Sequence, residues 1–382
     1  MKKLAILCNG ISSKITDRVE LVELVNSKGI QPYIAGSFDG QTNAYYCSEN
    51  AMFLPIVASR NNTNPFKEID SIRSVSKTIK KEQIEMAIIY GVKNHPAMAI
   101  GCKLGGIKKM MCIVNGSGNL FKVQGLKGKI LRFMSFPMLK IAYAFCDSVC
   151  FQNEDDLNLF LDKKLIHNKK KVFLTAGSGV NLEKFPAAPL VEENRFLFLS
   201  RITESKGINE FIKAAYIVKE RYPNAQFDIV GPLDQSVEFG DKNYLSEAEK
   251  DGIVRYHGET KDVPFWMHKC RFFVYPSYYP EGVPRCAMQA LATGRPIITC
   301  DTPGCRVIVE NGINGLYAKT KDENDLAEKM IILIQNPEMT EKMAKLSRVK
   351  AEQEFNVNSI NESLLYHIGI AENEQLNWEN II

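Results

Sequence analysis

Residues 275–301 read YPSYYPEGVPRCAMQALATGRPIITCD, and this stretch predicts the fold around it. The apolar run 272–275 before it and the run 296–299 near its end are each short enough for a buried strand. Between the two runs, Pro284 suits the first position of a helix and Gly294 suits the position just past its end. A strand, a helix and a second strand in this order predict a parallel α/β crossover.

The loop Glu281-Gly282-Val283 leads the chain into the N-terminus of that helix. Free backbone N–H groups and the positive end of the helix dipole favour an anion there, and Gly282 allows a ligand to approach the backbone closely. The carboxylate of Glu281 suits hydrogen bonds from hydroxyls beside such an anion, as in a sugar, and Gln289 could reach a second set of hydroxyls. An ordinary crossover of any α/β domain explains the local pattern equally well.

The same alternation of strands and helices runs along the whole chain. The first half predicts strands over 4–8, 32–35, 53–57, 86–90, 110–114, 148–151 and 172–174, with helices over 15–27, 66–82, 95–104, 122–145 and 154–161. The second half adds strands over 196–199, 227–230 and 253–256, and helices over 207–221, 263–269, 322–335, 338–354 and 359–371. The expected fold class is α/β, with two doubly wound domains facing each other across a cleft.

A change of composition marks the expected boundary between the two domains. The segment Gly177-Ser178-Gly179-Val180-Asn181, followed by Pro186 and Pro189, has the composition of a hinge. We therefore predict a first domain over 1–185 and a second domain over 190–355. The helix within about 356–382 is expected to pack back on the first domain.

Length and composition limit the class of protein. The chain has 382 residues, of which 45% are hydrophobic, and this is enough for two full cores. No run of 18 uncharged apolar residues occurs, so no segment is expected to span a membrane. The ten cysteines form no Cys-x-x-Cys pair and lie mostly in apolar runs, as reduced core thiols of a cytosolic protein do. Neither a metal site nor a disulfide framework is expected.

The net charge of +4 hides an asymmetry between the two halves. Residues 1–189 hold 26 Lys and Arg against 15 Asp and Glu, a net charge of +11, and the remainder carries −7. A basic first half suits an anionic lipid or a diphosphate as its partner. No recognition helix, RNP sequence or zinc knuckle accompanies the charge, so nucleic acid is not an expected partner.

Segment 122–145 combines five basic residues with a nearly continuous apolar sequence. A basic, apolar segment of this kind can lie in a membrane interface. The favoured alternative is a helix, kinked at Pro137, that packs on the sheet with its lysines in water. Both can hold together, because Phe133 and Phe136 could face lipid while other positions face the core.

Three features of the first half are weaker candidates for a ligand cleft. The loop Asn115-Gly116-Ser117-Gly118-Asn119 follows a strand, at the edge where open α/β sheets bind ligands, although a plain loop explains its glycines as well. His95 begins the preceding helix and could be a polar group in the cleft, but a capping or surface histidine is the favoured interpretation. Gly10 lies in the turn after the first strand.

A second turn with charged side chains, a further candidate ligand site, follows the strand over 196–199. Arg201 and Lys206 bracket it, between the strand end and the next helix start. Two cations and a helix N-terminus can neutralise the charge of a departing nucleotide diphosphate. Alone, two such cations are usually solvated. Because Glu281 lies at another strand end of the same predicted domain, a diphosphate clamp is the better interpretation.

Several motifs of the second domain resemble glycosyltransferase family 4. They are SRITESKG at 200–207, the pair Val230-Gly231, YPSYYPEGVPR at 275–285 and TPGCR with NGING within 302–315. The first domain resembles it more loosely, through NGSG at 115–118, FQNEDD at 151–156 and GSGVNLEKF at 177–185. The likeness covers nearly the whole chain. Within the family, the chain is similar to the capsule, O-antigen and N-glycan assembly enzymes that extend polyprenyl-diphosphate-linked sugars.

The resemblance implies a GT-B fold and a retaining, metal-independent transfer of a hexose or N-acetylhexosamine from a nucleotide-diphosphate sugar, without a cofactor. The implied catalytic residues are Arg201 and Lys206 on the donor diphosphate and Glu281 on the donor sugar. The implied donor-binding residues are Gly231, Val263, Gly282, Val283, Pro284 and Gln289. A UDP sugar is the preferred donor over a GDP sugar, and Val263 is a candidate contact of the base.

Gln289 departs from the family pattern, which usually has a second glutamate at this position to bind the donor ribose. A neutral acceptor weakens that hydrogen bond by about 1 kcal/mol. The expected consequence is a raised donor KM or a shifted donor preference rather than loss of turnover. The departure keeps open an inactive homologue that binds a partner transferase.

A sugar-nucleotide epimerase on the same fold is the other alternative, although no convincing set of acid and base residues supports it. The expected partners are a nucleotide sugar, a glycan acceptor linked to a lipid, and the surface of an anionic membrane. The resemblance therefore implies a cytoplasmic protein that acts at the cytoplasmic face of the inner membrane, in capsule or lipopolysaccharide synthesis.

Overall fold

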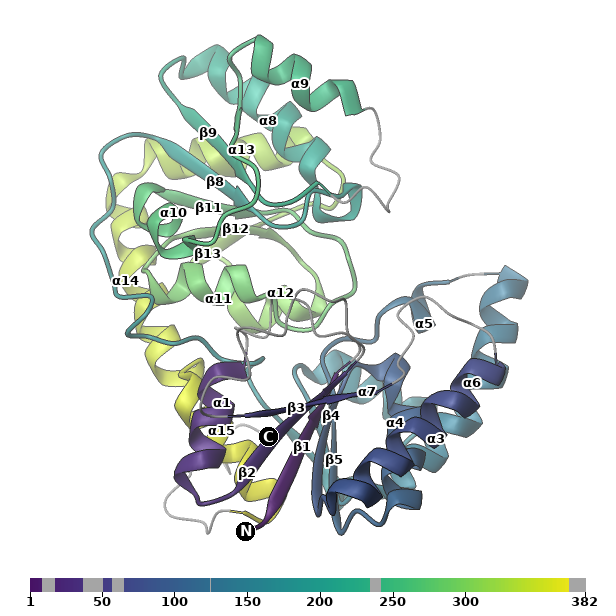
Figure 1. Cartoon of the computed structure of the whole chain (residues 1–382). Helices are drawn as coiled ribbons and strands as arrows, with labels where there is room; N and C mark the ends of the chain where they lie inside the picture. The colour runs from purple at the N-terminus through teal and green to yellow at the C-terminus, as the bar shows by residue number, and fades with distance from the viewer. Residues whose placement is uncertain (9–17, 37–50, 57–64, 124, 234–241, 371–382) are drawn as a thin grey trace. The chain divides into compact units, whose positions relative to one another are not determined.

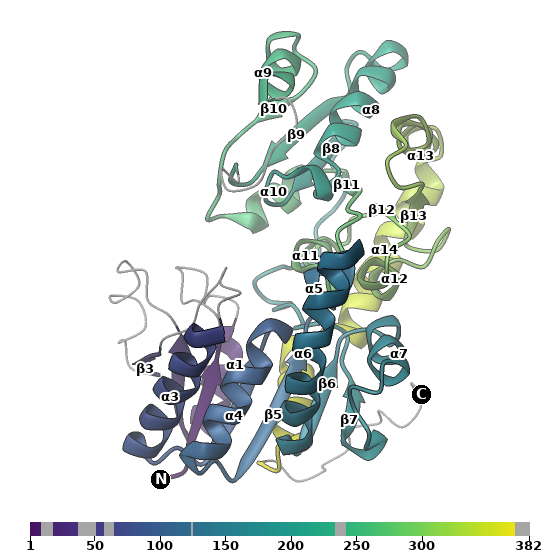
Figure 2. The same cartoon turned by 90° about the vertical axis from the view of Figure 1, so that its right-hand side faces the viewer.

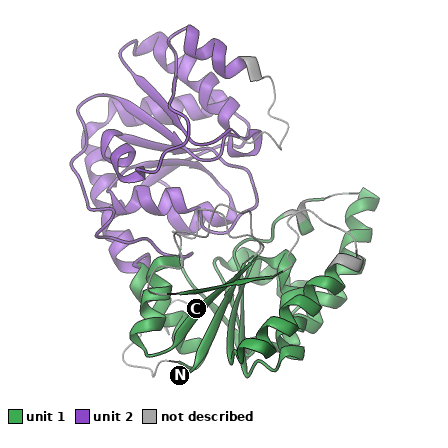
Figure 3. Ribbon diagram, viewed as in Figure 1, with its two compact units in different colours: residues 1–177, 357–382 green, residues 178–356 purple. Residues whose placement is uncertain are grey.

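The computed structural model describes residues 1–8, 18–36, 51–56, 65–123, 125–233 and 242–370. The chain forms two compact units (Figure 3). Unit 1 comprises residues 1–177 and 357–382, and unit 2 comprises residues 178–356. Each unit has one parallel sheet with helices on both of its faces. The predicted α/β class with two doubly wound sheets is therefore confirmed.

The sheet of unit 1 has seven strands in the order β3-β2-β1-β4-β5-β6-β7 (Figure 1). Their bounds are β1 Lys3–Leu7, β2 Gln31–Gly36, β3 Met52–Pro55, β4 Met86–Tyr90, β5 Lys109–Val114, β6 Ser148–Phe151 and β7 Val172–Leu174. The central strands are apolar along their whole length because helices cover both faces of the sheet. Every pair of neighbouring strands is parallel.

The helices of unit 1 form two layers. One face of the sheet packs against α3 (Pro65–Glu82), α4 (His95–Gly105), α6 (Gly125–Phe145) and α7 (Glu154–Asp162). The short α5 (Asn119–Lys122) precedes α6. The other face packs against α1 (Val19–Ser27) and α15 (Val357–His367), where the His367 ring stacks on Phe173 at 3.7 Å. Unit 1 thus contains the last helix of the described chain.

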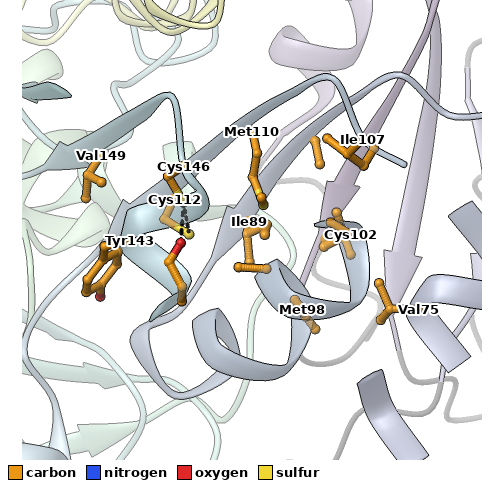
Figure 4. Close-up of a cluster of buried hydrophobic side chains, with 14 of the residues drawn as sticks. Val75, Ile89, Met98, Cys102, Ile107, Met110, Cys112, Tyr143, Cys146 and Val149 are labelled. Carbon is orange, nitrogen blue, oxygen red and sulfur yellow. Dashed lines mark hydrogen bonds between the residues drawn. The ribbon is translucent and has the colours of Figure 1, made fainter. Parts of the chain in front are cut away.

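The core between α4, α6 and the sheet is built from small and medium apolar side chains (Figure 4). Cys112 on β5 and Cys146 just after α6 lie within it, with their sulfur atoms 3.3 Å apart. In the described part of the chain all nine cysteines are free thiols, and eight of them are buried. Burial raises the pKa of Cys150 to about 12, so this thiol stays protonated at neutral pH. The expectation of core thiols is confirmed for these residues.

The sheet of unit 2 has six parallel strands in the order β10-β9-β8-β11-β12-β13. Their bounds are β8 Arg195–Leu199, β9 Gln226–Val230, β10 Arg255–Tyr256, β11 Phe272–Tyr275, β12 Ile297–Cys300 and β13 Gly315–Ala318. One face packs against α8 (Ile208–Arg221), α9 (Lys242–Lys250) and α13 (Glu323–Gln335). Below the sheet in Figure 1 lie α11 (Arg285–Ala292) and α12 (Pro303–Ile308), while α10 (Val263–Lys269) lies beside β11. The long α14 (Pro337–Glu354) packs on α11.

Unit 2 begins at residue 178, earlier than the boundary expected at 185–190, and two arginines hold residues 185–189 to it. Arg295 is fully buried, and its guanidinium donates hydrogen bonds to the carbonyls of Ala188 at 2.9 Å and Pro189 at 3.0 Å. Arg348 likewise donates to the carbonyl of Phe185 at 3.0 Å. The hinge composition was recognised, but the side chains that hold this segment lie more than 100 residues away in sequence.

Several elements differ from the sequence expectation. Pro284 is the N-cap of α11, with Arg285 as the first helical residue, so its predicted place is wrong by one position. Gly294 lies just past the helix end in the left-handed conformation, as expected. Neither the polar α9, the six-residue α12 nor the four-residue β13 was predicted, because each lacks a clear apolar period.

None of the helices in the described ranges is both long enough and apolar enough to cross a lipid bilayer. The longest apolar one, α6, contains Pro137 and four basic residues between Gly125 and Phe145.

We predict that Arg295→Ala destabilises the protein by about 3 kcal/mol, because a fully buried side chain is removed and the carbonyls of Ala188, Pro189 and Cys270 lose its hydrogen bonds. Urea unfolding measures this change. Arg221→Ala, at an exposed position of α8, is the matched control, with an expected change within about 0.5 kcal/mol. Equal effects of the two substitutions would contradict the role assigned to Arg295.

Candidate active site

The two turns of unit 2 that carry the candidate site residues follow neighbouring strands at the centre of its sheet. β8 pairs with β11, and the chain proceeds from β8 to one side of the sheet and from β11 to the other. Open α/β sheets bind ligands at this kind of switch point, beyond the carboxyl ends of the strands. The turns that carry Lys206 and Glu281 both lie there.

Close backbone contacts hold the two turns together. After β8 the chain forms a short 3-10 turn, Glu204–Lys206, and then Gly207 in the left-handed conformation. A Cβ at Gly207 would lie 2.3 Å from the carbonyl oxygen of Pro276, so this position accepts only glycine. The backbone N–H of Tyr278 donates to the carbonyl of Ser205 at 3.1 Å.

A hydrogen-bonded group joins the two turns through their side chains. Lys206 Nζ lies 2.6 Å from Glu281 Oε1 and donates to the hydroxyl of Tyr275 at 2.6 Å. The Tyr275 hydroxyl donates in turn to Glu281 Oε1 at 2.5 Å, and the Ser277 hydroxyl donates to the same oxygen at 3.2 Å. We call Lys206, Tyr275, Ser277 and Glu281 the Lys206 cluster.

Burial makes the charges of this cluster interdependent. Lys206 is 6% exposed, and an ammonium group at this depth requires a partner. The side chain of Glu281 is 24% exposed, so it supplies that partner while it still reaches solvent. Burial and then the negative charge of Glu281 raise the pKa of Tyr275 well above its usual value. The phenol therefore stays protonated and donates its hydrogen bond.

The loop 281–284 continues from the cluster into α11 and is supported from behind by α12. A Cβ at Gly304, in the first turn of α12, would lie 1.8 Å from the carbonyl oxygen of Gly282 and 3.0 Å from that of Glu281. Gly282, Val283 and Pro284 are buried. No side chain caps the start of α11, and the backbone N–H of Ala287 in its first turn donates to the carbonyl of Pro284 at 3.2 Å.

The remaining predicted residues of unit 2 lie around the cluster in different settings. Arg201 follows β8 with its side chain exposed, and Gln289 is half-buried in α11. Val263 is the first residue of α10 and is half-buried. Gly231 directly follows β9, and a Cβ there would lie 1.8 Å from the carbonyl oxygen of Ser200. Close approach of two strand ends thus accounts for this glycine without a ligand.

The predicted residues of unit 1 lie apart from any comparable cluster in the described chain. His95 is fully buried, with Nδ1 3.0 Å from the Tyr143 hydroxyl, and burial lowers its pKa to about 3. It is a neutral core residue, so the capping or surface role expected for it is not correct, whereas the cleft role stays a prediction. Asn115 is exposed, whereas Gly116 is buried and has a φ of 109°. Gly10 lies outside the described residues.

Sequence reasoning missed three contributors to the cluster. Tyr275 was read only as the last residue of an apolar strand, and Ser277 as part of a loop. Gly304 was quoted only as part of a motif. The Tyr-Pro-Ser order offered a signal for the first two, because hydroxyl side chains directly after a buried strand point toward the ligand edge of the sheet. In the described ranges, no group of three or more His, Cys, Asp or Glu side chains is placed to hold a metal ion.

Comparison with known proteins agrees with this placement. Residues 181–350 match the family model described as glycosyl transferases group 1, which covers the whole site in unit 2. A curated relative from Campylobacter jejuni, N,N'-diacetylbacillosaminyl-diphospho-undecaprenol alpha-1,3-N-acetylgalactosaminyltransferase, is 27% identical over 301 residues, 75% of this chain and 77% of the relative.

Two further comparisons extend the likeness to most of the chain. An uncharacterized glycosyltransferase of Methanocaldococcus jannaschii is 30% identical over 270 residues, which cover 68% of this chain and 70% of the relative. The crystal structure of Anabaena HepE in complex with UDP matches with a TM-score of 0.74 and 16% identity, over 96% of this chain and 99% of that one. The fold is therefore GT-B, and the chain belongs to the group 1 family of glycosyl transferases.

Proposed function

We propose that this chain is a retaining, metal-independent glycosyltransferase of family 4. It transfers a hexose or N-acetylhexosamine from a nucleotide-diphosphate sugar to a glycan acceptor linked to polyprenyl diphosphate, in capsule or lipopolysaccharide synthesis. The observation that carries the proposal is the Lys206 cluster at the switch point of unit 2. The Campylobacter relative, whose name includes an undecaprenol-linked acceptor, supports the acceptor class, and the UDP complex of HepE supports a UDP sugar.

Lys206 can hold a phosphate oxygen without leaving its partners. An ammonium group has three N–H donors, and two of those of Lys206 point to Tyr275 and Glu281. The third is available for an oxygen of the donor diphosphate. Because Lys206 is buried, its attraction for that oxygen is weakened little by water. Arg201, exposed at the same strand end, adds the second positive charge, and the N-terminus of α11 adds the positive end of its helix dipole.

The two carboxylate oxygens of Glu281 have different hydrogen-bonding roles. Oε1 accepts the hydrogen bonds of Lys206, Tyr275 and Ser277, and none of these three involves Oε2. Oε1 therefore fixes the carboxylate in place, and Oε2 can accept hydrogen bonds from hydroxyls of the donor sugar. A fixed acceptor beside a fixed cation sets the sugar and its diphosphate in one orientation.

The proposed reaction breaks the bond between C1 of the sugar and the diphosphate oxygen, and it forms a bond from C1 to the acceptor hydroxyl oxygen on the same face. The proton of that hydroxyl passes to the departing diphosphate oxygen. The protein's share is to stabilise the negative charge that gathers on the diphosphate, through Lys206 and Arg201.

An inactive, partner-binding homologue is the second candidate, and Gln289 is the observation that favours it. The donor ribose would lose a charged acceptor there. The proposal expects Gln289→Glu to raise kcat/KM for the donor about fivefold, through a lower KM, in a transfer assay with nucleotide sugars. Absence of turnover from both versions with every nucleotide sugar, despite donor binding, would favour the inactive homologue.

Substitution of either clamp cation should slow transfer. We expect Arg201→Ala and Lys206→Ala each to lower kcat more than tenfold, because a charged contact to the departing diphosphate is lost. Steady-state kinetics with the donor in excess measures this loss. Lys213→Ala, an exposed lysine of α8, is the control and should keep the wild-type rate. Unchanged rates in the Arg201→Ala and Lys206→Ala variants would contradict the role of these two residues in binding the donor diphosphate.

The two polar side chains of the loop and of α11 should contribute unequally. We expect Glu281→Gln to lower kcat more than Gln289→Ala does, because Glu281 anchors Lys206 and contacts the transferred sugar. Gln289→Ala should act mainly on donor KM. Parallel kinetics of the two variants test the order, and the reverse order would show that their roles are exchanged.

A further inference from the structure

The outward face of α6 carries a row of exposed apolar side chains. Phe133 is 83% exposed and Leu126 is 74% exposed, and three others exceed 45%, namely Ile130, Met134 and Ile141. Their spacing of three, four or seven residues places them on one side of the helix. The opposite side is buried through Gly128, Leu139, Ala142 and Tyr143. The helix therefore has apolar residues both toward the core and toward the outside.

Among the described residues of unit 1, none covers this outer row. The inner side of α6 packs against α4, α5 and the sheet. Within unit 1, α6 lies on the flank at the right of Figure 1, which faces the viewer in Figure 2. Phe136 points inward, where its ring lies 5.8 Å from that of Phe121. Of the two phenylalanines that could face lipid by sequence, only Phe133 is turned outward. A contiguous exposed apolar row of this length marks an interaction surface.

Lysines border the row on both sides. At 100° per residue, Lys129 and Lys140 fall along one border and Lys127 along the other. Arg132 is turned inward instead, where it donates to the carbonyls of Leu120 and Val123. The surrounding sequence adds to the positive field. Residues 86–146 contain eight Lys and one Arg but no Asp or Glu. An apolar row bordered by cations is the pattern of a helix lying in the interface of an anionic bilayer.

We propose that the outer face of α6 docks on the surface of an anionic phospholipid bilayer, with Phe133 and its apolar neighbours among the acyl chains and Lys127, Lys129 and Lys140 at the phosphates. The inference rests on the proposed function to the extent that a lipid-linked acceptor lies in such a surface. A second copy of the chain is the less suitable occupant, because two such faces would bring like charges together without any acidic partner.

Flotation with vesicles tests the docking face. The full chain is mixed with vesicles of phosphatidylcholine alone, or with 30% phosphatidylglycerol, at about 50 and 500 mM salt. We expect the wild type to bind the anionic vesicles and to lose most of that binding at high salt. Ile130→Asp with Phe133→Asp should lower partitioning more than tenfold. Lys127→Glu with Lys129→Glu should do the same at low salt, because each lysine near the surface contributes about a fivefold factor.

Matched controls separate this face from general charge and hydrophobicity. Lys77→Glu with Lys80→Glu removes the same charge from exposed positions of α3 in unit 1, and Val349→Asp replaces a 43% exposed apolar residue of α14. Both controls should bind like the wild type. Absence of wild-type binding to anionic vesicles overturns the proposal, and so does an equal loss in the controls. A concentration-dependent dimer that the α6 variants abolish, without vesicle binding, assigns the face to a second copy instead.

A parallel readout keeps this proposal separate from the proposed function. Stabilisation by UDP is measured on the same α6 variants, because none of their substituted residues belongs to the Lys206 cluster. Retained UDP binding with lost vesicle binding supports docking through α6. Retained UDP binding without any vesicle binding in the wild type overturns the docking alone. If UDP does not stabilise the wild type, the proposed function is contradicted. The vesicle result then decides the docking proposal alone.

Discussion

The ion pair between Lys206 and Glu281, bridged by the Tyr275 hydroxyl, is the interaction on which the site depends. A buried ammonium group is costly unless a carboxylate and further hydrogen bonds surround it. Here Lys206 lies in the turn after β8, and its partners come from the last residue of β11 and the loop that follows it. The pair fixes the distance between the turns. It also keeps a full positive charge in a place with little water, where the charge acts strongly on an anionic ligand.

Close backbone contacts at two glycines hold the turns around the ion pair in place. Gly207 allows the first turn to touch Pro276, and Gly304 allows α12 to touch the loop at Gly282. Any side chain at either position would push the loop away from Lys206. The same rigid arrangement is what a donor site requires, since charge stabilisation is strong only when the charged groups need no rearrangement as the reaction proceeds.

Much of this could be predicted from the sequence, for reasons that are local. Parallel strands place their carboxyl ends at one edge of a sheet, so Lys206 and Glu281, each after a buried strand, were expected to meet there. The roles of Tyr275 and of Arg295 could not be predicted, because an apolar period says that a residue is buried but not what its polar end contacts. His95 shows the converse: a polar residue at a helix start favours a capping or surface position, while the fold turns its ring toward Tyr143 in the core.

Thermal unfolding in the presence of uridine, UMP, UDP and UDP sugars, for the wild type and for Lys206→Met, tests the central claim most directly. The account predicts that UDP and a UDP sugar at about 100 times their Kd stabilise the wild type by about 2.7 kcal/mol. Uridine should stabilise it much less, and Lys206→Met should lose the response to the diphosphate while Lys213→Met keeps it. A response that is equal for uridine and UDP, or unchanged in Lys206→Met, would contradict the assignment of the Lys206 cluster to the donor diphosphate.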